Sequence, residues 1–158
     1  MVIVVALADV TLREHLENGM IRIVPFDESN LTPAGYDLRS AQEVVLKPRE
    51  QRLLATLERV ELTSNILGLL HIRSSFAREG IFASLAIVDP GFRGQLTVSL
   101  LNAGEGELKI RQGESFLQLT LIQLSSNAER SYEGKYQDSL GIVESKRRLN
   151  VIKSSKEA

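Results

Sequence analysis

The stretch LAIVDPGFRGQLTVSLLN, residues 85–102, decides the fold because it joins two apolar segments through a tight turn. Pro90 and Gly91 favour that turn, and the residues after it alternate apolar and polar, as in a strand with one buried face. Asp89 stands immediately before the turn, and the next carboxylate along the chain is Glu105. The pattern predicts a hairpin with a single acid at its mouth.

The same alternation continues through most of the chain. Strands are expected in IRIVP (21–25), EVVLKP (43–48), RLLATLERVEL (52–62), ILGLLHIR (66–73), GQLTVSLLN (94–102), GELKI (106–110) and SFLQLTLIQL (115–124). In the fifth run Leu96, Val98 and Leu100 share one face. Turn residues separate the runs, at 33–35, 90–91 and 102–104. So many short strands predict a mainly β fold, an antiparallel jelly roll or β-barrel.

Two short helices complete this prediction. Asp9 is expected to cap a helix over the residues that follow it, with Asn18-Gly19 as its end. A second helix is expected in RSSFAREGIF (73–82), where Ser74 or Ser75 can cap and Gly80 can terminate.

Length and composition indicate one domain with an ordinary core. The chain has 158 residues, a net charge of −1 and no cysteine. The charge argues against a broad nucleic-acid surface, and the missing thiols agree with a cytoplasmic location. Two histidines are too few for a histidine-built metal site, and the apolar opening is too short to span a bilayer, so no membrane partner is expected. We expect a β domain over 1–130 and a flexible C-terminal segment over 131–158.

Two local patterns can carry chemistry. Arg73 with Ser74 and Ser75 offers a guanidinium and two hydroxyls, which suit phosphate, although a helix cap beside a surface arginine has the same sequence. Asp89 can act as a base on water, or it can be a turn aspartate bonded to its own backbone. The apolar residues around Asp89 are expected to desolvate it in part.

Two further patterns leave a polar and a functional interpretation open. Gln118 lies in an apolar strand and points either to a ligand or to solvent. In YEGKYQ (132–137), Lys135 lies between two tyrosines and can bind phosphate, or the segment can be a solvated tail. His71 is interpreted as structural, and no pattern supports a nucleophilic triad.

Five motifs in order turn these weak signals into a specific resemblance. The series PAGYDLR (33–39), IRSSFAREG (72–80), AIVDPGFRG (86–94), GESFLQL (113–119) and GKYQ (134–137) resembles that of the dUTP pyrophosphatase (dUTPase) and dCTP deaminase superfamily. The resemblance covers residues 9–148 and is strongest to archaeal dUTPases. It implies a distorted jelly roll of the β-clip type, a homotrimer with active sites between subunits, and Mg2+ as cofactor.

The resemblance also implies roles for individual residues. Asp37 would help to organise the active site and its magnesium, and Asp89 would activate water. Phe92 replaces a tyrosine that usually stacks on the deoxyribose. The resemblance assigns contacts with the nucleotide to Arg73, Ser74, Ser75, Arg78 and Gln118, and to Tyr132, Lys135 and Gln137 of a closing segment.

One position separates the two reactions of the superfamily. Its deaminases carry a glutamate in the strand after the hairpin, where this chain has Ser99, and serine cannot shuttle protons at neutral pH as a carboxylate can. The expected activity is therefore hydrolysis of dUTP to dUMP and pyrophosphate. Three alternatives stay open: dCTP deamination, alone or combined with hydrolysis; a non-catalytic nucleotide-binding regulator; and a structural jelly roll without nucleotide.

Overall fold

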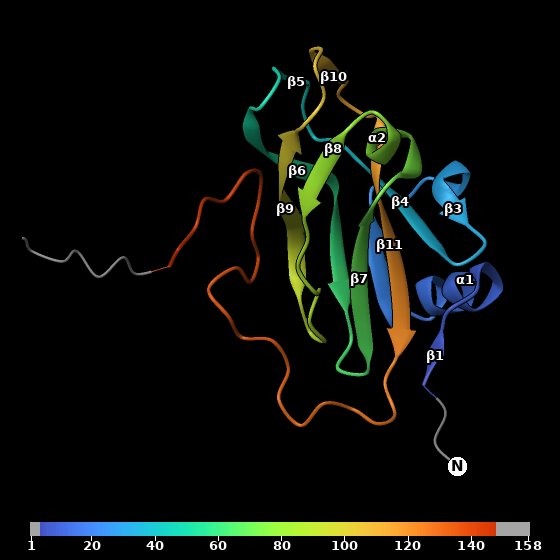
Figure 1. Ribbon diagram of the computed structural model, residues 1–158. Coiled ribbons are helices and arrows are strands. Elements are labelled where there is room, and N and C mark those ends of the chain that lie inside the picture. Colours follow the sequence, from blue (N-terminus) through green and yellow to red (C-terminus); the bar gives the residue numbers. More distant parts are fainter. Residues whose placement is uncertain (1–3, 148–158) are drawn as a thin grey trace, which may run out of the picture.

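A computed structural model describes residues 4–147 and shows two antiparallel sheets packed face to face (Figure 1). The elements in chain order are β1 (Val5–Ala6), α1 (Asp9–Glu17), β2 (Ile21–Val24), the 3-10 helix η1 (Glu28–Asn30), β3 (Leu31–Thr32), β4 (Gly35–Arg39), β5 (Val44–Leu46), β6 (Gln51–Leu62), β7 (Ile66–Ile72), α2 (Ser74–Arg78), β8 (Ile81–Ser84), β9 (Arg93–Asn102), β10 (Leu108–Ile110) and β11 (Ser115–Gln123). The predicted mainly β fold with two short helices is confirmed.

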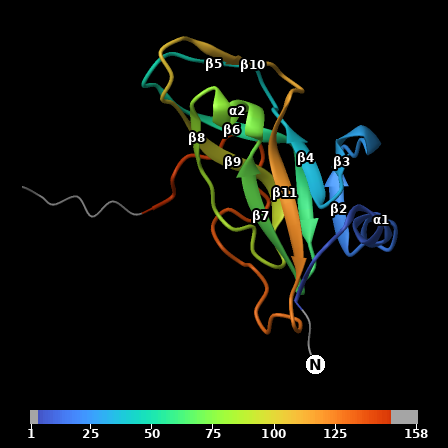
Figure 2. The same cartoon turned by 45° about the vertical axis from the view of Figure 1, so that its right-hand side comes forward.

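The two sheets divide the strands between them. In the first, β11 pairs with β1, β4 and β7, and β3 extends β4. The second has the order β2-β6-β9-β8, while β5 and β10 form a separate ribbon. Helix α1 lies at the side of the molecule next to β2 (Figure 2). No helix among residues 4–147 is long and apolar enough to cross a membrane.

The core follows the predicted alternation. Leu96, Val98 and Leu100 of β9 are buried, and the residues between them face outward. Since successive strand residues point to opposite faces, one face of each sheet supplies the core between them. The other face of β9 carries the polar residues that matter for the site.

Both predicted helices form, but α2 ends at Arg78, so that Ile81 and Phe82 of the predicted stretch belong to β8, and the caps of both helices differ from the prediction. Ala8, not Asp9, is the N-cap of α1, and Asp9 lies in the first turn with its Oδ1 accepting from the N–H of Val10 at 2.9 Å. Arg73, not Ser74 or Ser75, is the N-cap of α2. Each expected cap is therefore wrong by one or two residues, because backbone conformation, which the sequence does not show, decides where a helix begins.

A buried ion pair that sequence reasoning missed joins the two sheets. Glu58 of β6 is 0% exposed, and its carboxylate accepts from the Nε of Arg39 at 2.6 Å and from the backbone N–H of the same residue at 2.8 Å. Arg39 belongs to β4 of the other sheet. A buried carboxylate needs such partners, since leaving it unpaired is costly.

Removal of one partner of this pair tests its role. Arg39→Ala leaves Glu58 buried without a counter-charge and should lower the free energy of unfolding by about 3–5 kcal/mol. Chemical denaturation measures the difference. Lys109→Ala is the control, because it breaks an exposed pair with Glu43 and should cost less than about 1 kcal/mol. Equal effects of the two substitutions would contradict the buried role.

Candidate functional site

The site is built on the connection between β8 and β9. The N–H of Phe92 donates to the carbonyl of Asp89 at 3.1 Å, which closes the predicted turn. Gly91 has φ 85°, a value that side chains rarely adopt, and Pro90 precedes it, as in a type II turn. The turn fixes the backbone from Asp89 to Phe92.

A second contact ties this connection to the other sheet. Val88 and Gly68 of β7 exchange two backbone hydrogen bonds, each 2.9 Å long. A Cβ at position 68 would lie 2.9 Å from the Cβ of Val88, closer than real Cβ atoms approach. Only glycine at this position lets the segment before Asp89 lie directly on β7.

Asp89 lines a pocket of about 430 Å³, called here the Asp89 pocket. It is the only carboxylate lining it in the described part of the chain, and Phe92, Ser99 and Tyr136 also contribute. No described residue donates a hydrogen bond to the Asp89 side chain, so the expected bond to its own backbone does not form. Asp89 is also exposed, so the predicted partial desolvation is wrong: the neighbouring side chains of Val88 and Phe92 are buried, but that of Asp89 faces outward.

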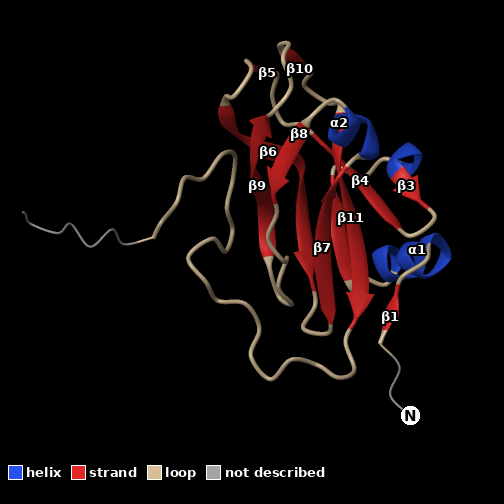
Figure 3. Ribbon diagram, in the orientation of Figure 1, coloured by secondary structure: helices blue, strands red, loops and turns tan. Residues whose placement is uncertain are grey.

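The C-terminal segment forms one wall of this pocket. Residues 131–147 have no helix or regular strand and run along the free edge of β9 (Figure 3). The N–H of Gln95 donates to the carbonyl of Ser139 at 2.8 Å, and its side-chain Oε1 accepts from the N–H of Gly141 at 2.6 Å. The rest of the predicted closing segment, residues 148–158, lies outside the described residues.

Gln137 and Asp138 attach the C-terminal segment to the turn and to β9. The Gln137 side chain donates to the carbonyl of Gly91 at 2.9 Å and accepts from the N–H of Arg93 at 2.8 Å. The Asp138 carboxylate forms ion pairs with Arg59, whose Nη2 lies 2.7 Å from Oδ1, and with Arg93, whose Nη2 lies 2.9 Å from Oδ2. These guanidinium groups hold the pKa of the Asp138 carboxyl well below its ordinary value. Both residues therefore act as a clasp on the segment.

An aromatic contact between Phe92 and Tyr132 also joins the C-terminal segment to the turn. Phe92 is buried, and its ring meets that of Tyr132 edge-on with centroids 5.7 Å apart. The N–H of Tyr132 donates to the carbonyl of Pro90 at 2.8 Å. The two rings both line the Asp89 pocket, so they offer it an apolar surface.

The other predicted residues gather elsewhere, in a group called here the Arg73 cluster. Arg73 Nε lies 3.1 Å from Asp37 Oδ2, and Gln118 is in register with Asp37 on the adjacent strand. The Gln118 side chain donates to the hydroxyl of Thr32 at 3.0 Å. Burial raises the pKa of the Asp37 carboxyl, while Arg73 opposes that shift.

One chain does not bring the Arg73 cluster and the Asp89 pocket together. Arg73 follows Gly68 by five residues along β7, about 17 Å at the rise of a strand, while Val88 lies beside Gly68. Ser74, Ser75 and Arg78 are exposed on α2 beyond Arg73. His71, predicted to be structural, is exposed in register with Gln118.

The donor set does not fit a metal ion held by the protein alone. Within residues 4–147 no three His, Cys, Asp or Glu side chains lie close enough to share an ion. Asp37, the residue expected to organise magnesium, has its carboxylate paired with Arg73. A magnesium ion carried by a triphosphate needs no such group, since phosphate oxygens supply its ligands.

A larger hollow of about 620 Å³ is lined by Met20, Arg93 and Glu133. Arg93 and Gln137 line it, but both are already committed to the clasp. The Asp89 pocket is therefore the better candidate for chemistry.

The known proteins that resemble this chain in sequence belong to one superfamily, that of dCTP deaminases and dUTPases. The family described as dCTP deaminase-like matches residues 40–124. A dCTP deaminase of Pyrococcus abyssi is 44% identical over 142 residues, 80% of this chain and 92% of that protein. A probable deoxyuridine 5′-triphosphate nucleotidohydrolase of Sulfolobus islandicus rod-shaped virus 1 is 31% identical over 152 residues, 87% of this chain and 96% of that protein.

The solved structures agree at the level of fold. A mutant dUTPase from phage phi11 of S. aureus superposes with a TM-score of 0.58 at 21% identity, over 72% of this chain and 97% of the phage protein. The name of that structure mentions a structural Mg(II) ion. At this identity the likeness concerns the fold alone.

The clasp predicts how the C-terminal segment responds to mutation and pH. Asp138→Asn removes the charge that both arginines face and should speed amide hydrogen exchange in residues 138–143 severalfold. Because the pKa of Asp138 is lowered from 3.8, the carboxylate stays ionised above that pH, and wild-type protection should be constant from pH 4 to 7. The protection should weaken only when the pH falls through the pKa that the Asp138 carboxyl has in the folded protein.

Hydrogen exchange followed by mass spectrometry measures this effect. Glu144→Gln is the matched control, since Glu144 is exposed in the same segment and its side chain makes no hydrogen bond with a described residue. Unchanged exchange in Asp138→Asn would show that the two arginines do not hold the segment.

Proposed function

Because this chain belongs to the dCTP deaminase and dUTPase superfamily, we propose that it hydrolyses dUTP to dUMP and pyrophosphate. One observation carries the proposal: Asp89 is the only carboxylate that lines the Asp89 pocket in the described chain. Hydrolysis at phosphorus needs one base to activate water, whereas deamination also needs protons delivered to the ring and to the leaving ammonia.

Asp89 suits the role of that base. Its carboxylate is exposed to water and receives no hydrogen bond from the described residues, so both oxygens can accept one. In the proposed reaction it takes a proton from a water aligned on the α-phosphorus, and pyrophosphate leaves. Phe92, on the same wall, packs against the deoxyribose.

The phosphates need groups that the Asp89 pocket lacks. No lysine or arginine of the described chain lines it. Arg73, with Ser74, Ser75, Arg78 and Gln118, would bind the triphosphate from a neighbouring subunit of a homotrimer, and the separation of about 17 Å within one chain supports this arrangement. Tyr132 and Lys135 approach the nucleotide from the C-terminal segment. Bound with the substrate, Mg2+ neutralises charge on the triphosphate oxygens.

A second candidate is dCTP deamination, alone or combined with hydrolysis. The names of the relatives favour it, since the Pyrococcus abyssi protein at 44% identity is a dCTP deaminase. The pocket favours hydrolysis, since Ser99 stands where deaminases of the superfamily have glutamate. The Ser99 hydroxyl accepts from the Nε2 of Gln51 at 2.6 Å and cannot replace a carboxylate.

Separate assays of the two products decide between these candidates. The full chain is incubated with dUTP or with dCTP, each with magnesium, and pyrophosphate and ammonia are measured independently. We expect pyrophosphate from dUTP and no ammonia from dCTP. Release of ammonia from dCTP without pyrophosphate from dUTP would show deamination in place of the proposed hydrolysis. Release of both products would show a bifunctional enzyme. Saturable binding of dUTP without either product would indicate a regulator.

The role of Asp89 is tested by a single substitution. Asp89→Asn should keep nucleotide affinity and lower turnover of dUTP roughly 100- to 10,000-fold, because a positioned base is lost. Glu105→Gln, at an exposed acid in the loop after β9, is the control with the same change of charge. Near-normal turnover in Asp89→Asn would remove this residue from the mechanism.

Mixing two inactive variants tests the shared site. Arg73→Ala and Asp89→Asn are refolded together in equal amounts, so that subunits combine at random. If each site takes Asp89 from one subunit and Arg73 from the next, about one quarter of the sites recover both residues. Pyrophosphate release should return to that fraction of the wild-type rate. No recovery in a mixture that forms trimers would contradict the arrangement.

A further inference from the structure

The pocket leaves the charge of a triphosphate unbalanced. Asp89, its only carboxylate in the described chain, repels phosphate, and no cationic side chain lines it. Cationic side chains that bind the phosphates must therefore lie at the rim of the pocket or come from another subunit.

Two lysines of the C-terminal segment lie close together, each adjacent in sequence to a residue that lines the Asp89 pocket. The Nζ of Lys135 donates to the backbone carbonyl of Lys146 at 3.0 Å, and the Nζ of Lys146 donates to the carbonyl of Lys135 at 2.8 Å. The two Nζ atoms lie 5.6 and 5.7 Å from the ring centroid of Tyr136. Reciprocal hydrogen bonds thus hold both ammonium groups around one aromatic ring.

This lysine pair has no counter-charge among the described residues. Neither Lys135 nor Lys146 takes part in an ion pair within residues 4–147. An ammonium has three N–H donors, and the carbonyl bond uses one of them. Several donors on two adjacent positive charges therefore remain for an anion.

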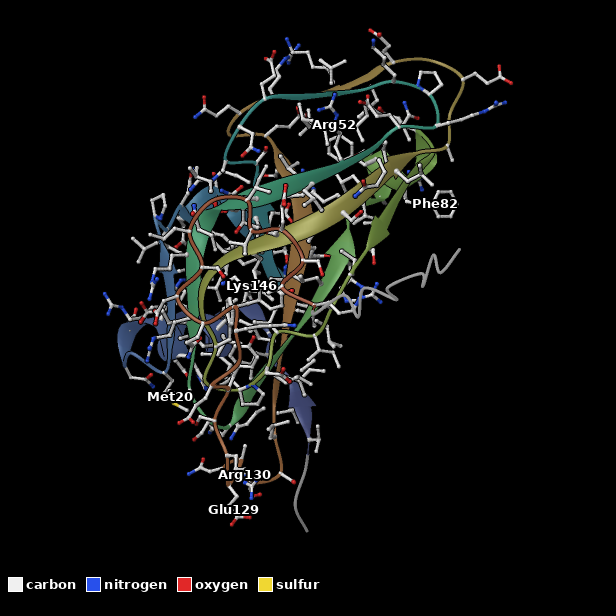
Figure 4. All side chains as sticks on the ribbon, turned by 90° about the vertical axis from the view of Figure 1, so that its left-hand side faces the viewer. Met20, Arg52, Phe82, Glu129, Arg130 and Lys146 are labelled. Atoms are coloured by element: carbon white, nitrogen blue, oxygen red, sulfur yellow. The ribbon has the colours of Figure 1, made fainter. Side chains whose placement is uncertain are left out.

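The surroundings of Tyr136 support the same view. Its phenol accepts from the backbone N–H of Lys146 at 3.0 Å, and this bond together with the nearby ammonium charges lowers the pKa of the phenol. Tyr136 and Ser145 line the Asp89 pocket, and each is next to one of the lysines in sequence. Figure 4 shows Lys146 in front of the sheet that contains β6 and β9, on the face that the C-terminal segment covers.

We propose that Lys146 binds the polyphosphate of the substrate together with Lys135, as a cation pair that the C-terminal segment places at the rim of the Asp89 pocket. The ligand chemistry is a pair of linked phosphates, whether in a nucleoside triphosphate or in released pyrophosphate. The proposal rests on the proposed function in taking this nucleotide as dUTP. Lys146 is thereby a binding residue outside the five sequence motifs.

Calorimetric titration of the full chain tests the role of Lys146 with three probes: the non-hydrolysable α,β-imido analogue of dUTP, inorganic pyrophosphate and dUMP. Lys146→Gln should weaken the imido analogue roughly three- to tenfold, the range for an exposed charge-assisted contact. The affinity for dUMP, which lacks the linked phosphates, should not change. The pyrophosphate titration shows whether the lysine pair also binds the released product. If Lys146→Gln loses as much affinity for pyrophosphate as for the imido analogue, the pair binds both; if it loses none, the pair binds only the triphosphate.

Two further variants separate binding from support of the segment. Lys47→Gln removes the same charge from an exposed lysine of the loop after β5 and should leave all affinities unchanged. Lys146→Arg keeps the charge and should retain most of the affinity. Equal losses for dUMP and the imido analogue, or no loss for the analogue, would overturn the proposal.

These outcomes are independent of the proposed reaction. If the wild type releases pyrophosphate from dUTP while Lys146→Gln binds the analogue normally, the lysine pair fails and hydrolysis stands. If the wild type binds the analogue through Lys146 but releases no pyrophosphate, hydrolysis fails and the lysine pair stands.

Discussion

The candidate site depends on a mismatch in length between two neighbouring strands. β9 has ten residues, whereas β8 has four and pairs only with residues 99–102 of β9. After Ser84 the chain leaves this edge and crosses to Gly68 on the other sheet. The edge of β9 from Arg93 to Val98 is thereby left open, and the departing segment carries Asp89 to its border. An unpaired edge of this kind needs a partner, and the C-terminal segment supplies one.

The C-terminal segment pairs with β9 only in part, and the pocket lies where it does not. Ser139 bridges to Gly94 in parallel, and Thr97 bonds to Gly141 and Val143 further along. Ser99 then pairs with Ser84 of β8. The hollow is bounded by the crossing segment, the face of β9 and the C-terminal segment, so its shape depends on how firmly that last segment is held. The clasp at Gln137 and Asp138 is therefore part of the site although neither side chain is free for a ligand.

Periodicity made most of the fold predictable, and the site less so. The seven strand runs and both helices were readable because alternating burial is a local property. The buried pair of Arg39 and Glu58 was not, because their 19-residue separation in sequence carries no sign of contact. Exposure of Asp89 was also mispredicted, since its neighbours Val88 and Phe92 are buried in the core while the side chain of Asp89 faces outward. The sequence did not mark Gly68 as important, because a side chain at this position would collide with Val88, which lies on a distant segment of the chain.

The distribution of charge within the site would orient the proposed substrate. A polyphosphate entering beside Asp89 is repelled by the carboxylate, while Lys135 and Lys146 attract it to the rim. The uncharged base and sugar meet no such repulsion, and the rings of Phe92 and Tyr132 offer them an apolar wall. A nucleotide bound with its base inward and its outer phosphates at the rim has its α-phosphorus between the two, on the side of Asp89. In the proposed complex the single acid would be close to the one phosphorus whose attack by water separates monophosphate from pyrophosphate, and Ser99 would face the base without a charge to alter it.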